Sequence, residues 1–181
     1  MHICVYCASS QKADPVYREA AFRFGELLAD GGHTLVYGGG GIGSMGAVAN
    51  GVLSRNGKVV GIIPRFLLER EMKHKDLTEL VVVEDMHERK YKLLHSADAV
   101  VALPGGCGTL DELFETMTLK RLGRHHKPII LLNTKNFYGP LETFMRQVVD
   151  EHFMTRPDAD LWHTVAEPED VLPAVAAQVV S

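Results

Sequence analysis

The stretch VVALPGGCGTLDELFE, residues 100–115, places an apolar strand, a glycine-rich turn and an amphipathic helix one after another. Residues 100–103 favour a strand, and Pro104 followed by three glycines in four residues ends it. Beyond this turn, apolar residues recur at the spacing of one helical face, which predicts a helix over residues 109–123: Leu110, Leu113, Phe114 and Met117. This strand–turn–helix order is the unit from which α/β proteins are built.

The same alternation of strand and helix runs along the whole chain. The predicted strands are residues 3–7, 33–37, 58–63, 80–84, 99–103, 127–133 and 162–166. The predicted helices are residues 15–30, 44–55, 86–96, 109–123, 138–152 and 168–179, with a long loop at residues 65–77. Continuously apolar strands are typical of a parallel sheet covered by helices on both faces. We therefore expect a Rossmann-like, doubly wound α/β fold, with residues 1–181 in a single domain.

The composition limits the classes of function. The chain has 181 residues, of which 46% are hydrophobic, and a net charge of -4, so broad binding to nucleic acid or to anionic membranes is not expected. No apolar run approaches the roughly 18 residues of a membrane span. The N-terminal MHICVYCASS lacks the basic region of a signal peptide. We expect a soluble, cytoplasmic protein.

The cysteines and histidines give no pattern of a redox or metal centre. Cys4 and Cys7 spell C-x-x-C, but on a strand residues three apart point to opposite faces. Cys107 is distant in sequence from both. His125 and His126 are adjacent, and His87 is not followed by the second histidine that a zinc-binding helix needs. We expect neither a metal nor a cofactor.

The predicted topology itself says where a ligand would bind. In doubly wound sheets, ligands bind outside the carboxyl ends of the strands. The segments expected at that edge are residues 9–10, 38–46, 64–72, 85–90, 104–112 and 133–136. Two glycine-rich turns and a charged segment are therefore predicted to share one edge of the sheet.

The first glycine-rich turn, YGGGGIGSMG at residues 37–46, contains G-x-G-x-x-G at Gly41, Gly43 and Gly46. A nicotinamide-binding site would also need an acidic residue at the end of the next strand, where this chain has Pro64 and Arg65. Mononucleotide binding and tight packing of helix on strand are the two interpretations that remain, with a nicotinamide-dependent reductase as a distant alternative.

The second turn, PGGCGT at residues 104–109, is the better phosphate candidate. Its glycines open the backbone, and Thr109 can cap the helix or donate its hydroxyl group to a phosphate oxygen. Thr109 and Glu112 also fit a capping box, in which the glutamate bonds back to the backbone of the cap. The pattern alone leaves capping and ligand contact open for Glu112.

The charged segment HERK at residues 87–90 has two interpretations as well. Such runs usually form a solvated helix face. Its position after a strand also makes Arg89 and Lys90 candidates to pair with a phosphate or carboxylate.

Together these segments resemble the LONELY GUY family, the cytokinin-activating nucleoside monophosphate phosphoribohydrolases. The signature P-G-G-x-G-T-x-x-E is matched by residues 104–112, and the family's M-x-x-R-K segment by residues 86–90. YGGGGIGSMG is similar to the family's Y-G-G-G-x-x-G-x-M-G. The resemblance covers nearly the whole chain. It implies hydrolysis of the N-glycosidic bond of AMP or of a cytokinin riboside 5′-monophosphate, giving the free base and ribose 5-phosphate.

The resemblance also implies a role for each matching residue. Arg89 and Glu112 would be the catalytic pair. The resemblance further implies at least a homodimer and a small nucleotide as substrate. Leu119 and Arg121 depart from the family near the expected base pocket, which leaves the preferred base open. The implied substrate-binding residues are Glu71, Lys90, Gly105, Gly106, Cys107, Gly108, Thr109, Leu110, Asp111 and Thr118.

A different class of function uses the same scaffold. Molybdenum-cofactor carrier proteins share the P-G-G-x-G-T turn and bind a phosphorylated ligand without hydrolysing it. A non-catalytic nucleotide or cofactor carrier is therefore the alternative. A pure binder has no need of Arg89 and Glu112 together, so this pair favours the enzyme.

Overall fold

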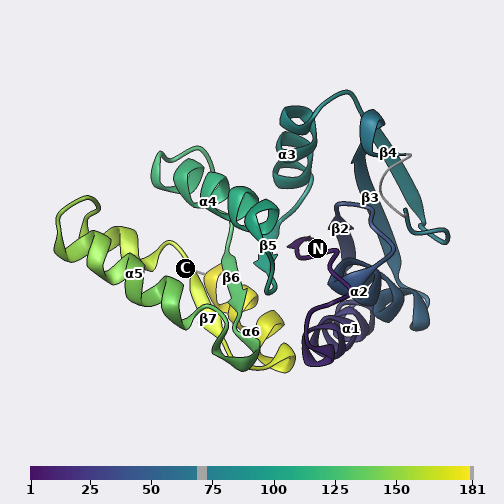
Figure 1. The fold of residues 1–181 in the computed structure, drawn as a ribbon, viewed down its shortest axis with the longest axis horizontal. Helices are drawn as coiled ribbons and strands as arrows, with labels where there is room; N and C mark the ends of the chain where they lie inside the picture. The colour runs from purple at the N-terminus through teal and green to yellow at the C-terminus, as the bar shows by residue number, and fades with distance from the viewer. Residues whose placement is uncertain (69–72, 180–181) are drawn as a thin grey trace.

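The computed structural model describes residues 1–68 and 73–179, apart from the side chains of residues 157 and 159 (Figure 1). Within these residues, parallel strands form one seven-stranded sheet in the order β4-β3-β2-β1-β5-β6-β7. This is the doubly wound α/β sheet that the sequence predicts. The strands are β1 (His2–Tyr6), β2 (Thr34–Tyr37), β3 (Lys58–Pro64), β4 (Glu79–Val83), β5 (Ala99–Ala102), β6 (Ile129–Leu132) and β7 (His163–Val165).

Helices cover both faces of the sheet (Figure 1). Helices α1, α2 and α6 contribute to the apolar core on one face, and α3, α4 and α5 to the core on the other. Short 3₁₀ helices at Arg65–Leu67, Thr134–Asn136 and Arg156–Asp160 lie in the connections. The helices are α1 (Pro15–Asp30), α2 (Gly43–Ser54), α3 (Met86–His95), α4 (Cys107–Arg121), α5 (Gly139–Asp150) and α6 (Pro168–Val179).

Strand β1 shows how the two cores are separated. Ile3 and Val5 belong to the core under α1, α2 and α6, whereas Cys4 and Tyr6 belong to the core under α3, α4 and α5. Cys7, directly after the strand, faces the same core as Ile3. Cys4 and Cys7 therefore lie on opposite faces, as predicted, and both are buried free thiols.

Local sequence signals set most helix boundaries. Asp14 caps α1 by accepting a hydrogen bond from the backbone N–H of Val16 at 3.1 Å, and Pro15 occupies the first turn. Asp85 caps α3 in the same way, with Oδ1 2.8 Å from the backbone nitrogen of Glu88. These two helices start where the sequence predicts. Helix α4 starts two residues before the predicted Thr109, because Gly106 in an extended conformation acts as its N-cap.

Helices α1 and α2 cross with their backbones in contact at Gly25 and Gly51. A Cβ atom on Gly51 would lie 3.0 Å from the carbonyl carbon of Phe22 and closer still to its oxygen. Gly51→Ala is expected to lower the free energy of unfolding by about 1–3 kcal/mol, because overpacking outweighs the better helix propensity of alanine.

Chemical denaturation measures this effect. The matched control is Gly108→Ala, another helical glycine, where an added Cβ would meet no atom within 4 Å. A Gly51→Ala variant as stable as the wild type would contradict the tight crossing.

The order of the strands fixes the position of a ligand site. From β1 the chain builds the sheet outward through β2 and β3 to β4, then returns to place β5 on the other side of β1. The loops after β1 and β5 therefore diverge to opposite faces and leave a crevice between them.

Candidate active site

The crevice at the carboxyl ends of β1 and β5 holds a cavity of about 370 Å³. The residues that line it come from the loop after β1, the start of α2, the loop after β3, α3 and the first two turns of α4. Six residues singled out in the sequence line this cavity: Arg89, Gly106, Gly108, Thr109, Asp111 and Glu112. The structure thus brings the predicted catalytic pair and the glycine-rich turn together.

The N-terminus of α4 opens into this cavity. Its cap residue, Gly106, has no side chain to bond the free N–H groups, and the first turn carries no acidic residue. A Cβ atom on Gly106 or Gly108 would meet no protein atom within 4 Å, so the protein does not need glycine there for packing. By contrast, a Cβ atom on Gly105 would clash with the side chain of Thr109. The open space at the positive helix end is suited to an anion.

The capping-box interpretation of Glu112 is wrong. Helix α4 begins at Cys107, so Thr109 is its third residue and not its N-cap. Glu112 then lies almost two turns into the helix, beyond the reach of the N-cap backbone. Its side chain lines the cavity and is only 8% exposed.

Arg89 reaches the same cavity from α3. The residue is 4% exposed, and its Nη2 donates a hydrogen bond of 3.3 Å to the carbonyl oxygen of Gly38, at the end of β2. A Cβ atom on Gly38 would clash with this guanidinium group. Among the described residues, no hydrogen-bond acceptor reaches the buried Nε of Arg89. The first glycine of the YGGGG segment therefore makes room for an arginine that lies far away in sequence.

The pKa of the Cys7 thiol depends on the charges of Glu112 and Arg89. Burial raises the pKa of Cys7, the nearby Glu112 raises that pKa further, and Arg89 lowers it. All three residues line the first cavity, and Cys7 stays a neutral thiol in its wall.

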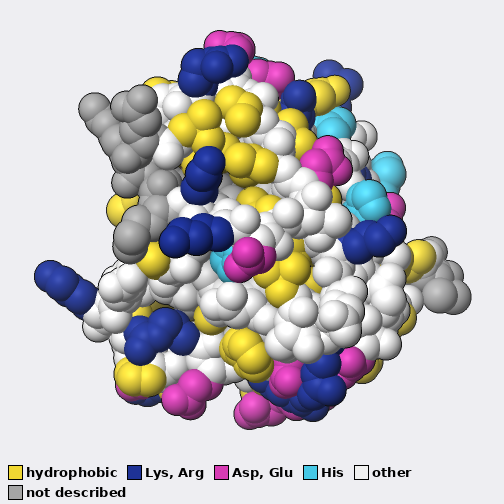
Figure 2. Space-filling view, turned by 90° about the vertical axis from the view of Figure 1, so that its right-hand side faces the viewer, with side chains coloured by type: hydrophobic (Ala, Val, Ile, Leu, Met, Phe, Trp, Pro, Cys, Tyr) yellow, Lys and Arg dark blue, Asp and Glu magenta, His cyan; other side chains and the backbone are white. Residues whose placement is uncertain are grey.

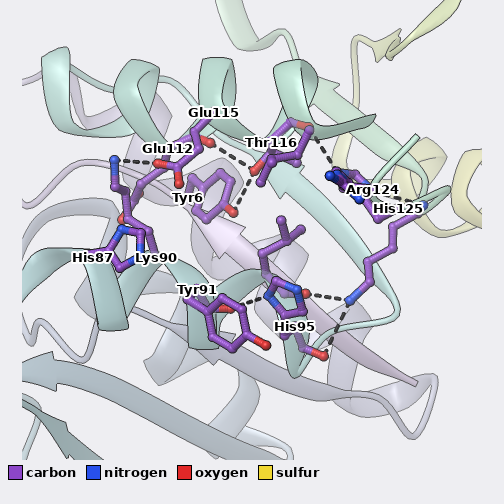
Figure 3. A pocket seen from close by; sticks show the side chains of 13 residues that line it. Tyr6, His87, Lys90, Tyr91, His95, Glu112, Glu115, Thr116, Arg124 and His125 are labelled. Carbon is purple, nitrogen blue, oxygen red and sulfur yellow. Dashed lines mark hydrogen bonds and ion pairs between the residues drawn. The ribbon is translucent and has the colours of Figure 1, made fainter. Parts of the chain in front are cut away.

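A second cavity, of about 400 Å³, lies between α3 and α4 (Figure 3). Glu112 lines both cavities. Lys90 lines the second cavity and not the first, and its ammonium group lies 3.2 Å from Oδ2 of Asp111 and forms an ion pair with Glu115. Tyr6 closes the floor through a hydrogen bond of 2.9 Å between its hydroxyl group and that of Thr116.

The remaining predicted residues lie around the site or outside the described residues. Cys107 is exposed at the first position of α4. Leu110 is half-buried and packs on the core under α4. Thr118 is exposed on α4 and lines neither cavity. Glu71 lies outside the described residues.

Sequence reasoning did not assign several residues of the first cavity. Ser9 and Ser10 follow β1 at the point where the strand order reverses, and this position was their only signal. Met45 and Met86 also line the cavity; they are the methionines of the two motifs at residues 37–46 and 86–90, but the sequence reasoning gave them no role.

The G-x-G-x-x-G segment serves tight packing in the structure. Gly43 has a positive φ of 61°, and a Cβ atom there would lie 2.5 Å from the carbonyl carbon of Ser9. A Cβ atom on Gly46 would clash with the carbonyl group of Gly41. Gly43 thus brings the start of α2 against the loop after β1, and Gly46 lets α2 pack on the turn that precedes it.

The fold and the cavity define a class: a Rossmann-like α/β protein with a buried arginine and glutamate beside a helix N-terminus open to an anion. Within that class, the chain belongs to the family described as possible lysine decarboxylases, whose sequence model matches residues 45–175 and which includes the LONELY GUY proteins. The resemblance seen in the motifs is confirmed.

Named relatives give the comparison more detail. The chain is 45% identical over 153 residues to a cytokinin riboside 5′-monophosphate phosphoribohydrolase of Arabidopsis thaliana, covering 84% of this chain and 70% of the relative. A probable enzyme of the same name from Oryza sativa subsp. japonica is 45% identical over 152 residues, covering 84% and 72%.

Solved structures share the fold at lower identity. The molybdenum cofactor binding protein of Rippkaea orientalis matches with a TM-score of 0.77 and 22% identity, over 99% of this chain and 97% of that chain. The molybdenum cofactor carrier protein of Chlamydomonas reinhardtii matches with a TM-score of 0.75 and 21% identity, over 99% and 98%. At this identity the likeness concerns the fold.

Proposed function

We propose that this protein hydrolyses the N-glycosidic bond of adenosine 5′-monophosphates, AMP or a cytokinin riboside 5′-monophosphate, to the free base and ribose 5-phosphate. One observation carries the proposal: two helices bring the buried side chains of Arg89 and Glu112 to the cavity into which the α4 N-terminus opens. The names of relatives that are 45% identical support the same activity.

The 5′-phosphate would bind at the N-terminus of α4. Backbone N–H groups of the turn at residues 105–109 would donate to its oxygens, and the helix dipole would favour its charge. Anchoring the phosphate uses binding energy remote from the reacting bond to hold the sugar beside Glu112.

The chemistry would be carried by Glu112 and Arg89. Cleavage of an N-glycosidic bond passes through an oxocarbenium-like state, which a nearby carboxylate stabilises. Glu112 would also take a proton from the water that attacks the anomeric carbon. Arg89, as a buried cation in the same cavity, would keep Glu112 ionised. The base leaves with the bonding electrons and takes up a proton, which balances the hydrolysis.

The carrier alternative explains less of the cavity. A protein that only carries a phosphorylated ligand needs the open helix N-terminus. It does not need an arginine and a glutamate, each more than nine-tenths buried, at the same cavity. Burying two charged groups costs free energy, so their presence favours the hydrolase.

We also propose a cytoplasmic homodimer. Figure 2 shows hydrophobic side chains gathered over the upper half of the face that carries β4 and α3, a feature typical of interaction surfaces. The free cysteines suit a reducing compartment. None of the described helices has the length and apolar character required to cross a bilayer. In β4, in α3 and in the connection before β4, the exposed apolar side chains include Phe66, Val82, Met86 and Tyr91.

The decisive experiment incubates the protein with AMP, with isopentenyl-AMP and with adenosine, and separates free bases from nucleotides by chromatography. We expect the two nucleotides to give equimolar base and ribose 5-phosphate, and adenosine, which lacks the phosphate, to react far more slowly. Tight binding of AMP without release of base would favour the carrier.

The phosphate site gives a prediction at Gly108. Gly108→Ala places a methyl group in space that the protein leaves open and the phosphate would fill. We expect KM for AMP to rise about tenfold, a loss of about 1.4 kcal/mol in binding, while stability stays equal or rises. Steady-state kinetics and thermal unfolding measure both. The slower hydrolysis of adenosine is the internal control and should not change; an unchanged KM for AMP would move the phosphate elsewhere.

A further inference from the structure

The two proposed catalytic residues lie on two helices with a cavity between them. Arg89 is on α3 and Glu112 on α4, and the second cavity of about 400 Å³ lies between these helices (Figure 3). Both helices also pack on the same apolar core of the sheet. The contacts that span the gap act together with that packing to fix the separation of the two side chains.

Lys90 spans the gap beside the catalytic pair. Its ammonium group forms an ion pair with Glu115 (Figure 3) and a second with Asp111, at 3.2 Å, so one side chain of α3 holds two carboxylates of α4. Lys90 directly follows Arg89 in the chain, and Asp111 directly precedes Glu112. The bridge therefore joins the two helices at the turns that carry the reacting groups.

The opposite end of the cavity has a bridge of its own. There Nζ of Lys127, which lies after α4, donates hydrogen bonds to the carbonyl oxygens of Leu94 at 2.5 Å and of His95 at 3.4 Å, at the end of α3. Lys127 thus ties the end of α3 to the segment before β6, whereas Lys90 joins α3 to α4 itself, next to the site.

The charge of Lys90 is paired with two carboxylates of the protein. The hydrogen bond to Glu115 raises the pKa of Lys90 most, and the one to Asp111 raises it further, so the side chain stays protonated between them. Asp111 also lines the first cavity, where an unpaired carboxylate would repel a phosphate group. Partly exposed ion pairs contribute little to overall stability, so any large effect of this bridge must come from geometry.

From this geometry we propose that Lys90 is a positioning residue. Its ion pairs with Asp111 and Glu115 hold α3 at a fixed distance from α4 and keep Arg89 and Glu112 in the arrangement that catalysis needs. The inference rests on the proposed hydrolase function and differs from a role of Lys90 as a phosphate ligand.

The kinetic test compares three variants with AMP as substrate. Lys90→Met is expected to lower kcat about 10- to 100-fold, the effect of a displacement of about 1 Å, with little loss of stability. Lys90→Arg, which can still bond both carboxylates, should recover most of that kcat. The variant Asp111→Asn/Glu115→Gln keeps the lysine but removes its partners, and should lose kcat to a similar extent as Lys90→Met.

The double variant separates positioning from phosphate binding. If Lys90 bound the phosphate directly, removing the carboxylates would free its charge, and AMP would bind equally well or more tightly with unchanged kcat. That result would overturn the inference. Adding Lys90→Met to the double variant should cause no further loss, because both changes remove the same bridge.

A crystal structure of Lys90→Met keeps the inference testable if AMP is not the substrate. Displaced Arg89 and Glu112 side chains with intact helices support the bridge, whatever the activity of the wild type. Unmoved side chains would refute it. Absence of base release by the wild type would instead refute the proposed function.

Discussion

Glu112→Gln is expected to lower kcat for the release of adenine from AMP by about 10²–10⁴-fold, the usual contribution of a general base. Glutamine has nearly the same shape, so the fold and the cavity should persist. It has no negative charge to stabilise an oxocarbenium-like state and no strong affinity for a proton from water. Chromatographic assay of the free base at saturating AMP measures the loss.

Two controls make this result specific. Glu19→Gln removes a charge from an exposed residue of α1 and should leave kcat unchanged. Ribose 5-phosphate should bind Glu112→Gln within a few-fold of its affinity for the wild type, because the phosphate is held by α4 backbone groups. Activity close to that of the wild type would remove Glu112 from the mechanism and revive the carrier function.

Arg89→Met is expected to lower kcat by about 10²–10³-fold, comparable to removal of one preorganised electrostatic partner from an active site. The buried guanidinium group is the cation that would keep Glu112 ionised. Arg89→Lys should restore only part of the activity, since an ammonium group is a point charge without the planar fork that reaches the carbonyl group of Gly38.

The matched control is Arg55→Met, which removes a partly exposed arginine that is paired with Glu26 at 2.9 Å. Its effect on kcat should be negligible. Circular dichroism establishes that each variant is folded. A fully active Arg89→Met protein would show that the buried charge serves packing and not catalysis.

The fold was predictable because its signals are local. Apolar runs and the glycines and prolines between them each act over a few residues and give nearly the correct elements, and the caps at Asp14 and Asp85 that the structure shows are local as well. The start of α4 was less accessible. Thr109 is a good N-cap by type, but the chain turns at Gly106, whose extended conformation the sequence does not encode uniquely.

For the candidate site, the sequence predicted that Arg89, Glu112 and the glycine-rich turn would lie together, as they do at the first cavity, but it did not predict their contacts. Shared sheet edges and motif spacing place Arg89 and Glu112 together. The hydrogen bond from Arg89 to Gly38 and the ion pair of Lys90 with Glu115 each join distant segments, and only the packed structure shows them. The roles expected of the site residues, that of Glu71 included, stay predictions.

The hollow at Gly38 gives a rule for sorting uncharacterised chains of this fold. Any side chain larger than hydrogen at that position would occupy the volume of the Arg89 guanidinium group. An arginine at position 89 and a glycine at position 38 are therefore expected to be gained and lost together, although 51 residues separate them. A chain that keeps the glycine-rich turn of residues 104–109 but carries a bulkier residue at the position of Gly38 has no room for the arginine side chain. Such a chain is predicted to hold its nucleotide intact.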